Sequence, residues 1–209
     1  MVGLVKVGSR LFTAEGPSVV HKLAQMGCGV FLDLKFHDIP STVAGAVSAA
    51  TRLPRVQFLT LHTLGGTEMM RAAAKAARMA RRRPMLLGVT ILTSHDSTSL
   101  SRLGIAGSPT NRAVKLARLA KRSGLDGVVA SAHEIRAIRR ACGLSFLIVV
   151  PGIRPSGSTS DDQSRIATPL AAIRAGANYL VIGRPITHAA DPRQAAVGIQ
   201  QEISEALQN

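Results

Sequence analysis

The sequence predicts an α/β protein, and three observations lead to this prediction. Short apolar runs rich in β-branched residues recur along the 209 residues, and a polar or glycine-containing turn follows each run. A helical stretch rich in Ala, Leu and Arg then follows each turn, which makes a βα repeat. The runs are apolar at nearly every position, which indicates parallel strands that helices cover on both faces.

Each of seven runs predicts one strand. The predicted strands are residues 3–8 (GLVKVG), 29–35 (GVFLDLK), 56–61 (VQFLTL), 85–92 (MLLGVTIL), 127–130 (GVVA), 146–150 (FLIVV) and 179–182 (YLVI). The predicted helices are residues 14–26, 42–52, 67–82, 111–123, 133–141, 169–175 and 192–207. A chain that is 46% hydrophobic can bury a sizeable core, so we expect a single domain over residues 1–209.

The number of strands leaves two architectures open. A (β/α)8 TIM barrel needs eight βα units, and the first predicted strand lies within a few residues of Met1 with no helix before it. The sequence therefore fits a barrel that lacks its first βα unit, and it fits an open doubly wound sheet equally well. No G-x-G-x-x-G motif follows a strand, which weakens the dinucleotide-binding form of the open sheet.

The composition disfavours several classes of protein. No apolar run approaches the roughly 20 residues of a membrane-spanning helix, and the N-terminus lacks the apolar core of a signal peptide. We therefore expect a cytoplasmic protein. Cys28 and Cys142 form neither a CxxC pair nor a His/Cys cluster, so neither a disulfide framework nor a zinc site is expected.

The formal net charge of +14 raises the question of nucleic-acid binding, because clustered Lys and Arg neutralise phosphates. However, the basic residues are spread along helix-like segments, only 3% of residues are aromatic, and no recognition motif is present. The densest cluster, residues 81–83, is expected at the carboxyl end of a helix, where cations complement the helix dipole. Nucleic acid is therefore not an expected partner.

The segment FLDLKFHDIPSTV, residues 31–43, is the most informative for chemistry. Alternate residues of a strand share a face, so Asp33 and Lys35 should point the same way at the carboxyl end of their strand, where barrel active sites lie. Asp38 follows in the loop. A purely structural Asp33–Lys35 pair is the alternative, although buried charges stabilise poorly. Lys6, in the preceding strand, could reach the same interior. Two lysines and two carboxylates would then converge in an array of alternating charges that contains a proton donor.

Two glycine-bearing loops after the last two predicted strands indicate a phosphate site. They are VVPGIRPSG, residues 149–157, and VIGRPIT, residues 181–187. Barrels commonly bind phosphate with the amides of the loops after these strands and with a helix N-terminus. Arg184 could add a charge-assisted hydrogen bond, and Gln163 lies in the long loop that could close over a ligand.

These motifs resemble those of the orotidine 5′-phosphate decarboxylase family. LDLKFHDIPSTV is similar to the family's D-x-K-x-x-D signature, and KVGSRLF, LHTLGG, VTILTS, VVPGIRP and VIGRPIT resemble its other blocks in the same order. D-x-K-x-x-D alone also marks related sugar-phosphate decarboxylases and synthases, but its combination with PGIRP and GRPIT is highly specific. The resemblance implies a homodimeric barrel that converts orotidine 5′-phosphate to UMP in pyrimidine biosynthesis, with neither a metal nor an organic cofactor.

The resemblance also implies a role for each matching residue. Lys35 would stabilise and protonate the C6 carbanion, Asp33 would lie beside the departing carboxylate, and Lys6 would bind the ribose region. Asp38 would come from the partner subunit. The implied substrate-binding residues are Ile39 and Thr42 beside Asp38, Thr93 and Ser94 at the pyrimidine, Gln163, Gly183 and Arg184 at the phosphate, and Gly152 and Arg154 in the adjoining loop.

The sequence departs from this family at its start, because nothing corresponds to a first strand ending in an aspartate that binds the ribose. A barrel without that strand would leave two edges unpaired.

One alternative function is that of a metal-dependent sugar-phosphate decarboxylase or synthase, which needs further carboxylate ligands. However, only His62 follows the strand at 56–61, and Glu68 comes too late in the sequence to join it. The other is an inactive basic barrel that binds nucleic acid. His37 is expected on the opposite strand face, in a structural role.

Overall fold

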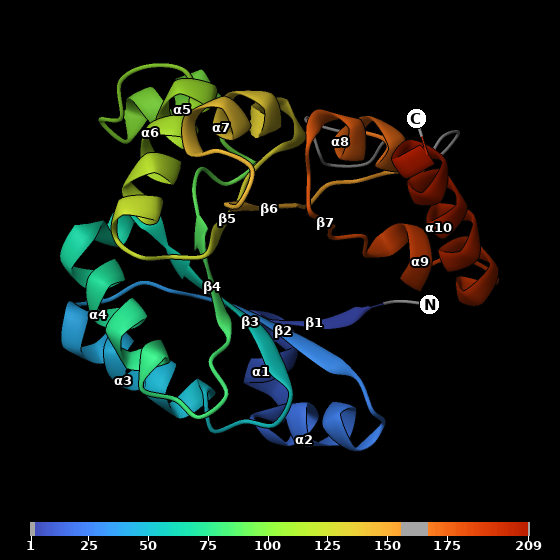
Figure 1. The fold of residues 1–209 in the computed structure, drawn as a ribbon, viewed down its shortest axis with the longest axis horizontal. Coiled ribbons are helices and arrows are strands. Elements are labelled where there is room, and N and C mark those ends of the chain that lie inside the picture. The colour runs from blue at the N-terminus through green and yellow to red at the C-terminus, as the bar shows by residue number, and fades with distance from the viewer. Residues whose placement is uncertain (1–2, 156–166, 209) are drawn as a thin grey trace. The chain divides into compact units, whose positions relative to one another are not determined.

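The computed structural model describes residues 3–155 and 167–208, and its alternating strands and helices confirm the predicted α/β class (Figure 1). The chain forms two compact units. The first unit comprises residues 2–89 and 119–127, and the second comprises residues 90–118 and 128–209 together with residue 1. The described residues contain seven strands, which is the number that the sequence predicts.

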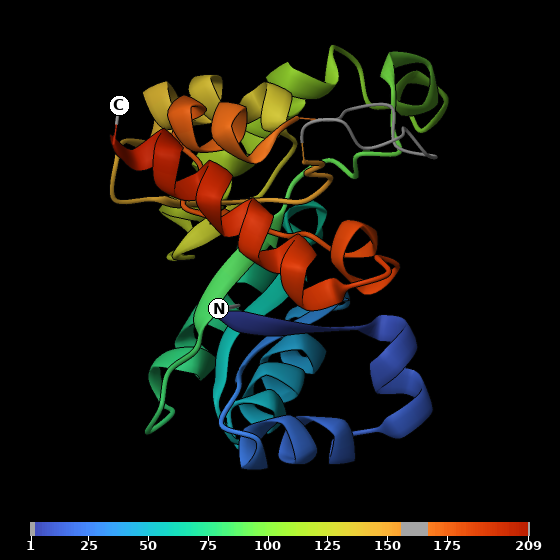
Figure 2. The ribbon, with the colours of Figure 1, turned by 90° about the vertical axis from the view of Figure 1, so that its right-hand side faces the viewer.

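Four parallel strands form the centre of the first unit. They are β1 (Leu4–Gly8), β2 (Gly29–Phe36), β3 (Val56–His62) and β4 (Met85–Val89). The strands pair in chain order, and the register sets Gly8 opposite Asp33, so the carboxyl end of β1 lies beside the later part of β2. The helices α1 (Ser9–Glu15), α2 (Ser18–Gln25), α3 (Pro40–Ala50) and α4 (Gly66–Arg78) lie along these strands, and the 3₁₀ turn η1 (Thr63–Gly65) precedes α4 (Figures 1 and 2).

The core of the first unit is made by apolar strand residues and by one face of α4. Leu32, Leu59 and Leu86 are fully buried, and Met69 and Met70 of α4 are buried with them. The burial of each such side chain away from water stabilises the folded state by roughly 1.5–3 kcal/mol. The strands are apolar at nearly every position because they pack in this core, as their sequence predicted.

Two predicted helices of the first unit differ from the structure. The predicted helix at 14–26 is divided into α1 and α2, because Gly16 has a φ of 61° and Pro17 follows it. The predicted helix at 67–82 ends at Arg78. Residues 81–83 therefore do not lie at the end of a helix, as predicted, but in the loop before β4, where Pro84 disfavours a helical conformation for the residue that precedes it.

The remaining strands are β5 (Gly127–Val129), β6 (Leu147–Val150) and β7 (Tyr179–Leu180). The remaining helical elements are α5 (Ser97–Arg102), α6 (Pro109–Arg122), η2 (Ala132–Glu134), α7 (Ile135–Cys142), α8 (Pro169–Ala175), α9 (Arg184–Thr187) and α10 (Pro192–Gln208). In the second unit β6 pairs parallel with β7, and the amide of Ala130 donates to the carbonyl of Val149 at 3.1 Å. Helices α8 and α10 pack side by side (Figure 2).

Helix α8 agrees with its predicted bounds because both of its ends carry strong local signals. The Thr168 hydroxyl accepts a hydrogen bond from the Ala171 amide at 3.2 Å, Pro169 occupies the first turn, and Gly176 ends the helix with a φ of 106°. The short helices α5 and α9 were not predicted. Helix α5 starts with a capping box between Asp96 and Ser99, and it buries Leu100.

No helix in the described part of the chain is both long enough and apolar enough to cross a membrane.

Candidate active site

Two lysines and one aspartate meet at the carboxyl ends of β1 and β2. Lys6 Nζ lies 3.3 Å from Asp33 Oδ2, and Lys35 Nζ lies 2.9 Å from the same oxygen. The Asp33 side chain is only 11% exposed, whereas those of Lys6 and Lys35 are 38% and 37% exposed. The sequence predicted that two lysines and two carboxylates converge, and the structure brings together three of these four side chains. The fourth, Asp38, makes no ion pair with either lysine. Both ammonium groups remain accessible to a ligand.

Thr60 completes this cluster from β3, and the sequence analysis did not identify it. Its buried hydroxyl donates to Asp33 Oδ1 at 3.0 Å and accepts from the Lys35 amide at 2.9 Å. One side chain therefore fixes both the carboxylate and the backbone of the lysine. The available signal was a single hydroxyl within the apolar run FLTL of a predicted strand.

The backbone at Lys35 is irregular. Lys35 has a φ of 52°, and the pairing of β2 with β3 changes register between Leu32 and Phe36. A positive φ is uncommon for a residue with a long side chain and is strained. The hydrogen bond from the Lys35 amide to Thr60 and the contact with Asp33 hold this conformation, so the ammonium position depends on the surrounding structure.

The Asp33 carboxyl is held in its ionised form. Burial alone would raise its pKa above the ordinary value of 3.8. The hydrogen bond and charge of Lys35, the charge of Lys6 and the hydrogen bond from Thr60 act in the opposite direction and lower the pKa below that value. Asp33 is therefore a fixed negative charge between two cations at neutral pH, and the arrangement provides a preorganised field.

Gly8 leaves room for the ammonium group of Lys6. A Cβ atom at this glycine would lie 3.1 Å from Lys6 Nζ, which is closer than ordinary van der Waals contact. Gly8 pairs with Asp33 in the β1–β2 register, so a side chain at this position would crowd the contact between Lys6 and Asp33.

The residues after β2 are exposed. Asp38 lies in the loop between β2 and α3, as predicted, and one of its oxygens accepts from the Ile39 amide at 2.6 Å. Ile39 is 63% exposed, which is high for a large apolar side chain, and Thr42 is also exposed. The rings of His37 and His62 stack with their centroids 5.2 Å apart, and His37 is exposed.

The other predicted substrate-binding residues belong to the second unit. Thr93 is half-buried and Ser94 is exposed, in the loop between β4 and α5. Gly152, with a φ of 75°, and Arg154, which is 8% exposed, follow β6, while Gly183 and Arg184 follow β7. Because the Val181 amide donates to the Val150 carbonyl at 2.8 Å, the last two loops start from neighbouring strands. Gln163 lies outside the described residues.

Among the described residues, no group of three or more His, Cys, Asp or Glu side chains is placed to hold a metal ion.

Comparison with known proteins identifies the family. The profile of the "Orotidine 5'-phosphate decarboxylase / HUMPS family" matches residues 1–199. A protein of Trichlorobacter lovleyi named orotidine 5'-phosphate decarboxylase is 55% identical, over 99% of this chain and 87% of its own length. A protein of the same name from Nitrosococcus oceani is 52% identical, over 96% of this chain and 86% of its own length.

Solved structures show the same relationship. The crystal structure of orotidine 5'-phosphate decarboxylase from Lactobacillus acidophilus matches with a TM-score of 0.84 and 38% identity, and the match covers 95% of this chain and 86% of that one. An uncharacterized conserved protein from Geobacillus kaustophilus matches with a TM-score of 0.83 and 40% identity, over 96% and 87% of the two chains. The profile match, the relatives and the two structures agree, and the chain belongs to the orotidine 5'-phosphate decarboxylase / HUMPS family.

Proposed function

We propose that this chain decarboxylates orotidine 5′-phosphate to UMP in pyrimidine biosynthesis, without a metal or an organic cofactor. The observation that carries the proposal is the convergence of Lys6 and Lys35 on the buried carboxylate of Asp33. The names of the relatives at 50–55% identity favour this reaction over a metal-dependent sugar-phosphate enzyme and over an inactive nucleic-acid-binding barrel.

In the proposed reaction the bond between C6 of the pyrimidine and its carboxylate breaks, and CO2 leaves. The bonding electron pair stays on C6, which then takes a proton from Lys35 Nζ. Asp33 holds this ammonium group at 2.9 Å and keeps it in place as negative charge develops on C6. Asp33 also lies beside the departing carboxylate, and Lys6 binds the ribose region.

The remaining assignments extend the proposal beyond this cluster. Thr93 and Ser94 contact the pyrimidine, and the two loops after β6 and β7 hold the phosphate through Gly152, Arg154, Gly183 and Arg184. Gln163, which lies outside the described residues, is assigned to the phosphate by the family resemblance alone. Arg154 and Arg184 have the charge and the planar donor geometry that phosphate requires. The enzyme acts in the cytoplasm as a homodimer of (β/α)8-type barrels that lack the first βα unit, and each site receives Asp38, Ile39 and Thr42 from the partner subunit.

Turnover in D2O tests the proposed chemistry. Because the C6 proton would come from an exchangeable ammonium group, UMP formed in D2O should carry deuterium at C6, which NMR detects. Lys35→Ala should lower turnover by about a thousandfold or more while leaving much of the affinity for UMP. The control is Lys75→Ala, which removes an exposed lysine of α4 and should leave turnover unchanged. Full turnover by Lys35→Ala would remove this lysine from the proton transfer.

A further inference from the structure

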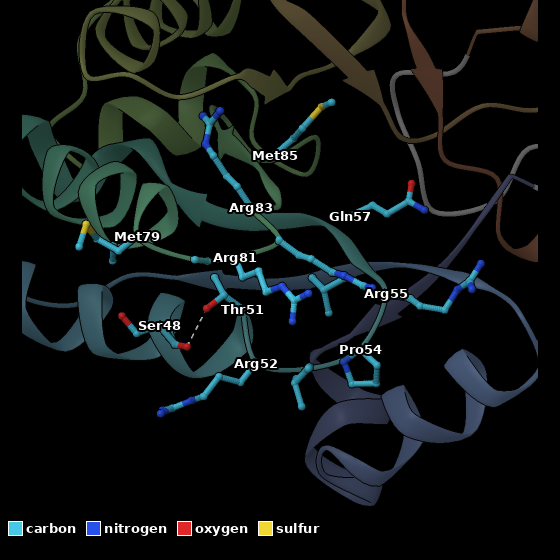
Figure 3. A pocket seen from close by; sticks show the side chains of 15 residues that line it. Ser48, Thr51, Arg52, Pro54, Arg55, Gln57, Met79, Arg81, Arg83 and Met85 are labelled. Atoms are coloured by element: carbon cyan, nitrogen blue, oxygen red, sulfur yellow. Dashed lines mark hydrogen bonds between the residues drawn. The ribbon is translucent and has the colours of Figure 1, made fainter.

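The first unit has a second concave surface, at the end of the sheet opposite to Asp33 and Lys35. A pocket of about 910 Å³ opens where β3 and β4 begin, and Figure 3 shows its lining side chains. These strands run parallel to β2, so their amino ends lie at the edge away from the carboxyl end that carries the lysines. The volume falls within the range of about 300–1,000 Å³ typical of small-molecule sites.

The pocket has a strong excess of positive charge. Its lining includes Arg52, Arg55, Arg81, Arg82 and Arg83, and none of the described residues that line it is acidic. Arg83 pairs with Asp126 at 2.6 Å, whereas the other four arginines form no ion pair with a described residue. Guanidinium groups stay charged at all physiological pH values, so this concentration of cations is permanent.

Helix dipoles do not account for these arginines. The last turn of α4 already contains Lys75 and Arg78, which complement its carboxyl end. Residues 81–83 follow beyond the helix, where the stabilisation by the dipole has fallen off. The arginines therefore have no structural role at the helix terminus that would explain their number.

Backbone contacts fix both loops that carry the arginines. Arg55 adopts a φ of 56°, its carbonyl accepts from the Val30 amide at 2.9 Å, and its Nε donates to the Cys28 carbonyl at 3.2 Å. In the other loop, Asp126 binds Arg83 and also accepts from the Leu86 amide at 2.7 Å. These contacts hold the two loops and two of the five arginine side chains, which lowers the ordering cost of binding.

We propose that this pocket binds an oligophosphate, a chain of two or three linked phosphate groups that is either free or part of a nucleoside triphosphate. Such a ligand brings several negative charges into one concave volume, and arginine binds phosphate oxygens through paired, charge-assisted hydrogen bonds. A single-stranded nucleic acid fits less well, because none of the described lining residues is aromatic and able to stack on bases.

Calorimetric titration of the full chain with sodium tripolyphosphate at physiological ionic strength tests the proposal. All titrations are made with excess UMP, which fills the phosphate site that we propose for the active site. We then expect saturable binding of one tripolyphosphate per chain. The double variant Arg81→Gln/Arg82→Gln should weaken this binding by about tenfold or more, because it removes two phosphate-binding cations. The control Arg136→Gln/Arg140→Gln removes the same charge from exposed positions of α7 and should change the affinity by less than about twofold. Decarboxylation should be unchanged in both double variants.

A second variant tests the pocket without altering an arginine. Met79 lines the pocket and is 83% exposed, so Met79→Glu places a negative charge at the site and leaves the core intact. This variant should also weaken tripolyphosphate binding. Equal weakening by the two double arginine variants, an unchanged affinity in Met79→Glu, or no binding by the unaltered chain would each overturn the proposal.

Two further titrations identify the source of the phosphates. Tighter binding of UTP than of tripolyphosphate would support a nucleotide ligand, and equal binding would support recognition of the phosphate chain alone. A single-stranded RNA that binds more tightly than both, and that is weakened equally by the two double arginine variants, would overturn the oligophosphate site in favour of a general basic surface.

Discussion

The Oγ1 atom of Thr60 links the two chemically active groups of β2, since it lies 3.0 Å from the Asp33 carboxylate and 2.9 Å from the Lys35 amide. A single hydroxyl on the neighbouring strand thereby fixes the distance between a negative charge and the proposed proton donor. Positions in such a site must be held closely for catalysis, so Thr60 is a positioning residue although it lies outside the D-x-K-x-x-D motif.

Thr60→Val should therefore lower both stability and activity. Loss of two buried hydrogen bonds should reduce the free energy of unfolding by about 1–3 kcal/mol. The value of kcat should fall by about tenfold or more, because the Lys35 backbone and the Asp33 carboxylate each lose the hydrogen bond that positions them.

Thr63→Val is the matched control for Thr60→Val, since the buried Thr63 hydroxyl donates only to the Val89 carbonyl, at 2.8 Å. Thr63→Val should lower the free energy of unfolding by a similar amount per lost hydrogen bond, and it should leave kcat unchanged. Denaturant unfolding and steady-state kinetics measure the two effects, and an equal loss of kcat in both variants would refute the positioning role.

Asp33 should make stability depend on acidic pH. Its pKa in the folded state lies below 3.8, so between the two pKa values the unfolded chain binds more protons than the folded one. The stabilisation is fully present above the unfolded pKa and is lost as the pH falls through the folded pKa. Between about pH 5.5 and about pH 3, the free energy of unfolding should fall by more for the unaltered chain than for Asp33→Asn. Equal losses would contradict the lowered pKa.

Arg139 should be a stabilising residue of the second unit. Its guanidinium lies within 2.9 Å of five oxygen atoms, those of the Gly143, Leu144, Phe146 and Gly176 carbonyls and of the Asn178 side chain. Arg139→Ala leaves these acceptors without a charged donor and should lower the free energy of unfolding by about 2–4 kcal/mol. The exposed neighbour Arg140 provides the control, because Arg140→Ala should change the free energy of unfolding by less than about 0.5 kcal/mol. Similar effects of the two changes would disprove this role.

Mixed dimers test whether Asp38 crosses the subunit interface. If each site combines Lys35 of one subunit with Asp38 of its partner, a dimer of one Lys35→Ala and one Asp38→Asn subunit retains one intact site. A one-to-one mixture of the two inactive variants should then recover about a quarter of the unaltered activity, since half of the dimers are mixed. Turnover after mixing measures this. A mixture as inactive as its components would place Asp38 in the site of its own subunit.

The sequence predicted those features that depend on local pattern. The seven strands follow from apolar runs. The predicted proximity of Asp33 and Lys35 is confirmed, although the regular strand alternation from which it was predicted is interrupted at Lys35. The positive φ at Lys35 and its contact with Thr60, 25 residues away, depend on how β2 pairs with β3, and no local pattern reveals that pairing. The sequence predicted that the helix continues through residues 81 and 82, because arginine favours helices. Composition alone therefore did not show that α4 ends at Arg78.

The most direct test of the central claim is turnover of orotidine 5′-phosphate by the purified chain, followed by loss of substrate absorbance with and without EDTA. Turnover should proceed at the same rate with and without EDTA, because the charges of Lys6, Asp33 and Lys35 supply the catalysis. Turnover that EDTA abolishes and a divalent cation restores would contradict the cofactor-free mechanism, and a folded chain that binds UMP but shows no turnover would contradict the proposed activity.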